Sequence, residues 1–293
     1  MPYTDHLYWL AQEDSPRSSE EKERDDGSYQ RARRLERRGE CEDGDPPRSL
    51  GSCSNPIPPN EDVVVVLGMP LMATAALHDA FNSVGLNSVH WALPADDRNN
   101  DHMLRINGHD ADKRLVSQLI RAAIRAGEPP MVRLPEGTRA IAHMNSLRWD
   151  GWGTKVYGDF PQMDDNVLSS FLDHYPKVKF ILNTRNAEGW MRSVNAHRDM
   201  KTRLIKANLP FLATEEGSQP GELEAWLRGH INRTKHFFNC ENQIDRLLYL
   251  DIDEELHRVK ERLENFLQRG PVKWEVVNKT PTSYSAMTGA CAA

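Results

Sequence analysis

A run of four valines, Asp62-Val-Val-Val-Val-Leu67, constrains the fold of this chain more than any other feature. A short, continuous run of β-branched residues is typical of a strand buried on both faces of a parallel sheet. Gly68-Met-Pro70 ends the run, and from Thr74 apolar residues recur at helical spacing until Gly85. The segment therefore predicts a strand, a tight turn and a helix, which together open an α/β domain.

The rest of the chain continues to alternate strand-like and helix-like segments, which predicts a parallel sheet with helices on both faces. Further strands are expected at residues 88–91, 154–157, 177–184 and 246–251. Helices are expected at 110–126, at 166–174, from Ala187 with Asn186 as N-cap, and at 254–269, with an inserted helical region over about 199–240. Residues 131–153 carry only weak signals. We predict one α/β domain over residues 59–293.

The N-terminal segment differs from the rest in composition. Residues 1–60 contain 13 acidic and 9 basic side chains, no Val, no Phe and a single isoleucine, Ile57. Such a stretch buries too little apolar surface to offset the entropy lost on ordering. We therefore expect residues 1–58 to form a disordered tail.

Charge and cysteine content disfavour several classes of protein. The formal net charge of −6 argues against a nucleic-acid binder, because phosphate backbones select basic surfaces. The four cysteines are widely scattered, so neither a disulfide scaffold nor a metal site is expected. The sequence shows neither a secretion signal nor a run of 18 apolar residues. These features predict a cytoplasmic protein with no membrane anchor, and they leave its oligomeric state open.

The turn after the first strand is the strongest candidate for anion binding. In an open parallel sheet, ligands bind at the carboxyl ends of the strands. The segment from Gly68 to Ala75 lies at such an end and leads into a helix, whose first N–H groups and positive dipole end attract phosphate. It is not a Walker A loop, because the closing Gly-Lys-Ser/Thr is missing. An ordinary strand-to-helix turn is the alternative.

A second turn carries a basic residue and a hydroxyl. Arg185 ends the strand expected at 177–184, and Ser193 lies about two helical turns further on. A guanidinium binds phosphate through two parallel hydrogen bonds, and a serine hydroxyl adds another. The pair predicts a second phosphate site, with an arginine that merely ends a strand as the alternative.

Together the two turns resemble sulfotransferases that use 3′-phosphoadenosine 5′-phosphosulfate (PAPS), in particular their short soluble microbial and algal branch. The family loop Gly-x-Pro-Lys-x-Gly-Thr-Thr corresponds to Gly68-Met-Pro-Leu-Met-Ala-Thr-Ala75. The later family pattern Tyr-Pro-x-x-Lys-Phe-Ile-Leu-x-x-Arg, followed by Trp and Ser, is matched by Tyr175-Pro-Lys-Val-Lys-Phe-Ile-Leu-Asn-Thr-Arg185 with Trp190 and Ser193. The resemblance spans about residues 63–278 and includes Asp159-Phe-Pro161.

This resemblance implies a three-layer, P-loop-like parallel sheet flanked by helices, and a set of donor contacts. The first loop would hold the 5′-phosphosulfate, and the Arg–Ser pair would hold the 3′-phosphate. The implied donor-binding residues are Gly68, Met69, Pro70, Leu71, Met72, Ala73, Thr74, Ala75, Arg185 and Ser193. The implied reaction moves a sulfuryl group from PAPS to a hydroxyl or amine of a small-molecule acceptor, without a metal.

One departure from the family pattern bears on activity. Leu71 stands where the family has the loop lysine, which removes the cation beside the 5′-phosphate. Since a charge-assisted hydrogen bond contributes about 1.5–3 kcal/mol, the loss weakens binding by about tenfold to a hundredfold. Either another cation, such as Lys155 or Arg192, reaches the site, or the protein is a catalytically impaired pseudoenzyme or a nucleotide-binding interaction module. A P-loop kinase or NTPase is a third hypothesis, disfavoured by the missing Walker lysine.

Sulfuryl transfer also requires a general base for the acceptor. Asp159 and His90 are the candidates, because each is expected to lie where a strand meets the ligand edge. The alternatives are a helix-capping role for Asp159 before Pro161 and a histidine that simply ends a strand. Asp159 is the preferred base.

Overall fold

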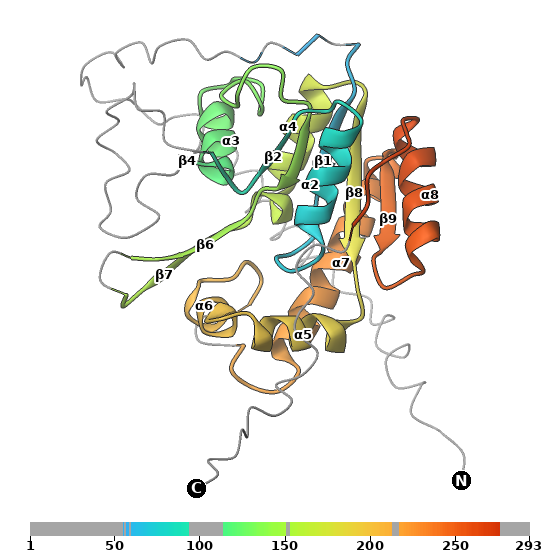
Figure 1. Ribbon diagram of the computed structural model, residues 1–293. Coiled ribbons are helices and arrows are strands. Elements are labelled where there is room, and N and C mark those ends of the chain that lie inside the picture. The colour runs from blue at the N-terminus through green and yellow to red at the C-terminus, as the bar shows by residue number, and fades with distance from the viewer. Residues whose placement is uncertain are drawn as a thin grey trace, which may run out of the picture. The chain divides into compact units, whose positions relative to one another are not determined.

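The computed structural model describes Asn55 and residues 57–58, 60–93, 114–150, 153–212 and 217–275. Five strands of this part form a sheet in the order β2-β5-β1-β8-β9, with every neighbouring pair parallel. They are β1 (Val63–Val66), β2 (Ser88–His90), β5 (Ala140–His143), β8 (Val178–Thr184) and β9 (Leu247–Asp251). The predicted parallel α/β architecture is confirmed, with β1 at its centre (Figure 1). The tail predicted for residues 1–58 lies almost entirely outside the described residues.

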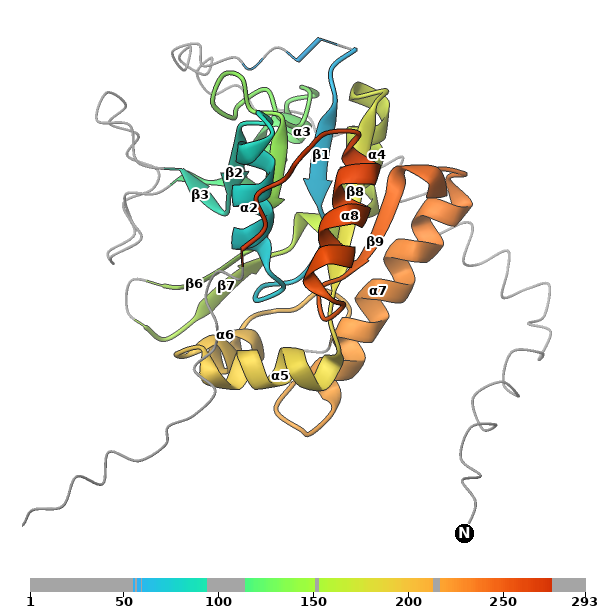
Figure 2. The same ribbon diagram turned by 45° about the vertical axis from the view of Figure 1, so that its right-hand side comes forward.

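Helices cover both faces of the sheet (Figure 2). α2 (Thr74–Ser83) and α8 (Leu256–Leu267) pack on one face, and α3 (Val116–Arg125), α4 (Asp165–His174) and α7 (Glu222–Cys240) pack on the other. The valine run serves both cores, because successive side chains of a strand point to opposite faces. Val64 and Val66 belong to the core beneath α2 and α8, whereas Val63 and Val65 belong to the opposite core.

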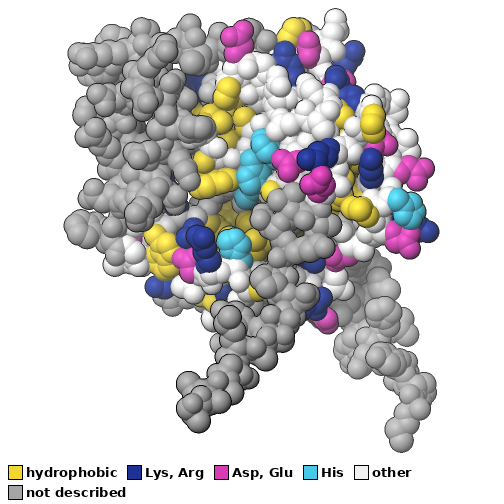
Figure 3. Space-filling model, in the orientation of Figure 1, with side chains coloured by type: hydrophobic (Ala, Val, Ile, Leu, Met, Phe, Trp, Pro, Cys, Tyr) yellow, Lys and Arg dark blue, Asp and Glu magenta, His cyan; other side chains and the backbone are white. Residues whose placement is uncertain are grey.

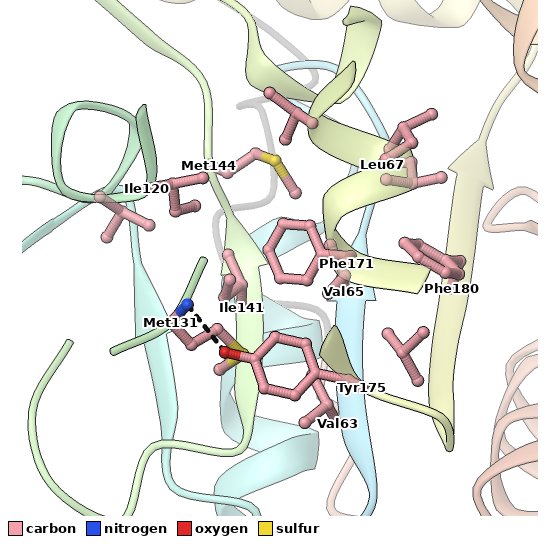
Figure 4. Close-up of a cluster of buried hydrophobic side chains, with 14 of the residues drawn as sticks. Val63, Val65, Leu67, Ile120, Met131, Ile141, Met144, Phe171, Tyr175 and Phe180 are labelled. Carbon is pink, nitrogen blue, oxygen red and sulfur yellow. Dashed lines mark hydrogen bonds between the residues drawn. The ribbon is translucent and has the colours of Figure 1, made fainter. Parts of the chain in front are cut away.

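The core beneath α3 and α4 also fixes a segment that carried weak sequence signals (Figure 4). Phe171 of α4 and Phe180 of β8 meet edge to face, with ring centroids 6.4 Å apart. Tyr175, just after α4, accepts a hydrogen bond from the backbone N–H of Met131 at 3.0 Å. Burial raises the pKa of Tyr175 to about 12, so its hydroxyl is neutral at pH 7.

Two further helices lie across the carboxyl ends of the strands, α5 (Ala187–Ala196) and α6 (Met200–Lys206) (Figures 1 and 2). The predicted N-cap of α5 is confirmed, because the Asn186 side chain accepts hydrogen bonds from the N–H groups of Glu188 and Gly189. The helical region predicted over 199–240 corresponds to α6 and α7. None of the described helices is long and apolar enough to cross a bilayer.

The sequence prediction was wrong about one strand of the sheet. β7 (Val156–Asp159), expected as the third sheet strand, instead pairs antiparallel with β6 (Ser146–Trp149) in a hairpin outside the sheet. Its place is taken by β5, whose Ala140-Ile-Ala-His143 is short and rich in alanine, a residue depleted in strands.

The other predicted elements differ from the structure only in their ends, and a few short elements were not predicted. α3 begins at Val116 rather than residue 110, after a small antiparallel pair of β3 (Ala92–Leu93) and β4 (Arg114–Leu115). Residues 110–113 lie outside the described part. Two short 3-10 helices, η3 (Pro161–Met163) and η4 (Ile244–Arg246), precede α4 and β9.

Candidate functional site

The loop between β1 and α2 is held by side chains from two other elements. Asn183 of β8 accepts a hydrogen bond from the backbone N–H of Gly68 at 3.0 Å and donates one from Nδ2 to the carbonyl of Met72. Trp190 of α5 donates from Nε1 to the carbonyl of Pro70 at 2.9 Å. Both anchoring side chains are fully buried. These bonds occupy loop carbonyl oxygens and fix the shape of the loop.

A buried histidine holds the start of the same loop. His230 of α7 is 2 % exposed, and its Nε2 lies 2.8 Å from the carbonyl oxygen of Leu67. Burial lowers the pKa of His230 to about 4, so the ring is neutral at pH 7. Because a carbonyl can only accept, Nε2 carries the proton of this neutral ring and donates it to Leu67.

In contrast to its carbonyls, several N–H groups of the loop bond to no other described residue. Leu71, Ala73 and Thr74 find no hydrogen-bond partner for their backbone N–H among the described residues. Leu71 and Ala73 have left-handed backbone conformations, with φ of 67° and 56°. Free N–H groups in such a turn, followed by the amino end of a helix, form a concavity suited to an anion.

Replacing Ala73 with glycine is expected to stabilise the protein. The left-handed conformation costs an L-residue about 1–2 kcal/mol, whereas glycine adopts it freely but loses about 0.5–1 kcal/mol more conformational entropy on folding. We expect Ala73→Gly to raise the free energy of unfolding by up to about 1 kcal/mol in urea titrations. Ala75→Gly, one residue into α2, is the control and is expected to lower it. Equal effects of the two substitutions would contradict the strain at Ala73.

In the described part of the chain, no cationic side chain is bonded to the loop at the place of the family lysine. The side chain of Leu71 packs against the apolar cluster that contains Met72 and Trp190. Lys155 lies over the ring of Tyr157, 5.2 Å from its centroid, and Arg192 is 75 % exposed, 3.9 Å from Glu188. Within the described residues, no lysine or arginine side chain hydrogen-bonds to the 68–75 loop, including these two predicted substitutes.

The second predicted turn brings Arg185 and Ser193 together. Nη1 of Arg185 donates to Oγ of Ser193 at 3.0 Å, and Nη2 lies 3.1 Å from Oδ1 of Asp253. Nε of Arg185 is buried and has no hydrogen-bond partner in the part of the chain that the structure describes. Ser193 lies about one turn after Trp190, which contacts the loop. Because β8 pairs with β1, the two predicted turns are neighbours at one edge of the sheet.

Thr74, the first residue of α2, contacts two histidines from neighbouring strands. Its hydroxyl lies 3.0 Å from Nε2 of His90 and 3.3 Å from Nδ1 of His143. The two rings stack edge to face, 4.9 Å apart. Burial lowers the pKa of His143 to about 4 and, with the neighbouring histidines, that of His90 to about 3. Histidine side chains reach the surface in the middle of the face shown in Figure 3.

Asp159, the preferred base, ends β7 of the hairpin rather than a strand of the sheet. Its Oδ1 accepts a hydrogen bond from Nε of Arg121 at 2.7 Å, and Arg121 also donates to Asp164 at 2.8 Å. The capping role considered for Asp159 belongs to Asp164, whose side chain accepts from the N–H of Asn166. Asp159 is thus held by an ion pair that the sequence did not predict.

Several residues of this site escaped the sequence prediction, and three of them illustrate why. Asn183 carried a usable signal, because a polar residue inside an apolar strand must have a buried partner. His143 ends a strand that the sequence pattern did not reveal. Asp253 contacts Arg185 across 68 positions of sequence, which no local pattern indicates.

The parallel sheet, with a loop and a helix start at its carboxyl edge, defines an α/β protein of P-loop-like architecture. A model of the sulfotransferase domain family matches residues 63–265, so the chain belongs to this family and the predicted resemblance is confirmed. No match was found among curated proteins. Among solved structures, an unliganded sugar kinase from Janibacter sp. HTCC2649 is 15 % identical with a TM-score of 0.28, and the match covers 72 % of this chain and 95 % of the kinase.

Proposed function

We propose that this protein transfers a sulfuryl group from PAPS to a hydroxyl or amine of a small-molecule acceptor. The observation that carries the proposal is the meeting of two anion-binding groups at one sheet edge. The free N–H groups of the loop form one, and the pair of Arg185 and Ser193 forms the other. A nucleotide with phosphate groups at both its 3′ and 5′ positions requires two such groups. Membership of the sulfotransferase family supports the reaction class.

The donor groups present fit this nucleotide. Nε of Arg185 is a buried donor with no partner, and a 3′-phosphate oxygen would satisfy it. Ser193 adds a hydroxyl that now accepts from Arg185 and lies 3.3 Å from the carbonyl of Gly189. The N–H groups of Leu71 and Ala73 suit the 5′-phosphosulfate. When bound, PAPS supplies the sulfuryl group and a bisphosphate leaving group.

The reaction also needs a base near the acceptor. As the acceptor oxygen or nitrogen bonds to sulfur, the bond between sulfur and the bridging phosphate oxygen breaks, and the acceptor proton passes to a base. Asp159 remains our proposed base, because its Oδ2 has no hydrogen bond with any described residue. His90 is the second candidate, and its Nε2 is engaged with Thr74.

Isothermal titration with adenosine 3′,5′-bisphosphate tests the proposed donor. We expect this ligand to bind at least tenfold more tightly than adenosine 5′-monophosphate, because only the bisphosphate uses the charge-assisted bonds of Arg185. No binding at millimolar bisphosphate would overturn the proposal.

A catalytically impaired pseudoenzyme, or a nucleotide-binding interaction module, is the second candidate function. It is favoured by one specific observation, the apolar packing of Leu71 where the family has a lysine. In this case the nucleotide binds, but no group stabilises the charge that develops on the leaving oxygen.

Replacing Leu71 with lysine separates the two candidates. The lysine stem can cover the same apolar cluster while its ammonium group reaches the loop. We expect Leu71→Lys to tighten bisphosphate binding at pH 8 by about tenfold to a hundredfold, and to accelerate transfer from PAPS if turnover has been lost. Leu71→Met is the matched neutral control. If the lysine and methionine variants bind equally, the site does not lack a cation, and the pseudoenzyme hypothesis loses its support.

A further inference from the structure

The hydroxyl of Thr74 belongs to a chain of hydrogen bonds whose direction is fixed at one end. Nδ2 of Asn145 lies 3.5 Å from the carbonyl oxygen of Gly68. Because a carbonyl only accepts, this end of the amide is the donor and Oδ1 at the other end is the acceptor. Nε2 of His143 lies 2.7 Å from that Oδ1 and must therefore carry a proton. Asn145 itself is 2 % exposed, so water does not compete for these bonds.

The protonation of His143 determines the direction of the next two bonds. A neutral ring with its proton on Nε2 has a lone pair on Nδ1, which accepts the hydroxyl proton of Thr74 at 3.3 Å. Since a hydroxyl has one proton, the contact of 3.0 Å between Thr74 and Nε2 of His90 requires His90 to donate. The chain runs from His90 through Thr74 and His143 to Asn145, and ends on the 68–75 loop at Gly68.

In this state Thr74 has no proton left for an anion in the loop. A hydroxyl offers one donor and two acceptor sites. If Nδ1 of His143 takes up a proton, both histidines donate to Thr74, and the hydroxyl proton is free to bind an anion. The three hydrogen-bonding sites of Thr74 are then all used.

The surrounding charges favour this protonated state only when an anion is present. Burial keeps His143 neutral in the free protein, and the positive end of the α2 dipole opposes a cation there. Among the described residues, the ionisable groups facing His143 are His90 of β2 and, beyond it, His78 of α2, which has Asp79 as its neighbour. An anion held by the loop reverses the balance, because it attracts a positive charge on the ring.

We propose that binding of an anion in the 68–75 loop is coupled to the uptake of one proton by His143. His143 is then the positioning residue that turns the Thr74 hydroxyl toward the anion and supplies the positive charge missing at Leu71. The identity of the anion, a nucleotide phosphate or phosphosulfate, rests on the proposed function. The hydrogen-bond chain does not.

Titration calorimetry in buffers of different ionisation enthalpy tests the coupling at pH 6.5. Wild type and His143→Asn are compared with adenosine 3′,5′-bisphosphate, because asparagine keeps a polar group near Nδ1 but cannot titrate. Both proteins share the proton uptake of the ligand itself. We expect wild type to take up about one proton more than the variant when the ligand binds. As the pH rises, the affinity of wild type should therefore fall more steeply than that of the variant, by an additional factor of up to about ten per pH unit. His174→Gln on the exposed end of α4 is the control and should behave as wild type. Equal proton uptake by wild type and His143→Asn would overturn the inference.

A second ligand separates this inference from the proposed function. If the bisphosphate does not bind, inorganic pyrophosphate is titrated, because it requires only the loop. Pyrophosphate binding with the additional proton would support the coupling while overturning the nucleotide assignment. Failure of both ligands would overturn both proposals. In Leu71→Lys the additional proton uptake should disappear, because the lysine supplies the charge.

Nitrogen-15 NMR of the histidines tests the chain without any ligand and without a variant. At pH 6.5 we expect neutral rings protonated on Nε2 for both His143 and His90. A charged His143, or a ring protonated on Nδ1, would overturn the inference.

Discussion

Replacing Arg185 with methionine is expected to weaken the binding of adenosine 3′,5′-bisphosphate by about a hundredfold. Arg185 offers Nε without a partner and Nη1 through its contact with Ser193. Each charge-assisted bond to phosphate contributes about 1.5–3 kcal/mol, so the loss of one such bond corresponds to a factor of about 10 to about 160 in affinity. Methionine keeps an unbranched apolar side chain in the partly buried position. Titration calorimetry measures the change directly.

Two further variants test whether the loss of affinity in Arg185→Met comes from direct contacts with the ligand or from the change in net charge. Arg192→Met removes the same charge from the exposed side of α5 and should leave the affinity within about twofold of wild type. Asp253→Asn removes the carboxylate that occupies Nη2 of Arg185, so it should strengthen binding. Adenosine 5′-monophosphate should respond to none of the three. An equal loss in Arg185→Met and Arg192→Met would show that long-range charge explains the result.

The order of strands and helices could be predicted wherever the sequence pattern is local and continuous. The valine run and the segment 177–184 identify β1 and β8, because both strands are buried on two faces. β5 was missed because two of its four residues are alanines, which are depleted in strands, and only its pairing with β1 and β2 identifies it as a strand. β7 was misplaced because a hairpin strand and a sheet strand share the same local preferences, and only long-range pairing distinguishes them.

In the candidate site, too, the local motifs could be predicted and the long-range contacts could not. The loop and the pair of Arg185 and Ser193 each lie within a few residues of sequence, so a motif can reveal them. The contacts that fix them come from elsewhere in the chain. Asn183 lies 115 positions from Gly68, and Arg121 lies 38 positions from Asp159. Sequence spacing cannot indicate such partners, because the tertiary fold brings them together.

The loop contains two left-handed residues in a row of three, Leu71 and Ala73, and neither of them is glycine. The strain is tolerated because the surrounding anchors determine the path of the chain more strongly than local preference does. Asn183 is the anchor that contacts the loop at two points, Gly68 and Met72.

Replacing Gly68 with alanine is therefore expected to lower the free energy of unfolding by about 3 kcal/mol or more. A Cβ atom at this position would lie 2.5 Å from Cγ and 2.7 Å from Nδ2 of Asn183. Since Asn183 is fully buried, it has no free space in which to move, and displacing it leaves the N–H of Gly68 and the carbonyl of Met72 unpaired. Each buried polar group without a partner costs about 1–3 kcal/mol. Urea unfolding followed by circular dichroism measures the loss.

A double-mutant cycle tests whether the contact with Asn183 is the cause. Asn183→Ala should itself destabilise the protein, because the loop loses its anchor, but it also opens the space that a Cβ at position 68 requires. We expect Gly68→Ala to cost less than about 1 kcal/mol in the Asn183→Ala background, which corresponds to a coupling of about 2 kcal/mol or more. Gly229→Ala is the control, because its Cβ would meet only the flexible end of Arg233 and a helix interior favours alanine. If the effects of Gly68→Ala and Asn183→Ala on the free energy of unfolding are additive, the contact with Asn183 is not the cause. The destabilisation by Gly68→Ala would then arise from the backbone at position 68.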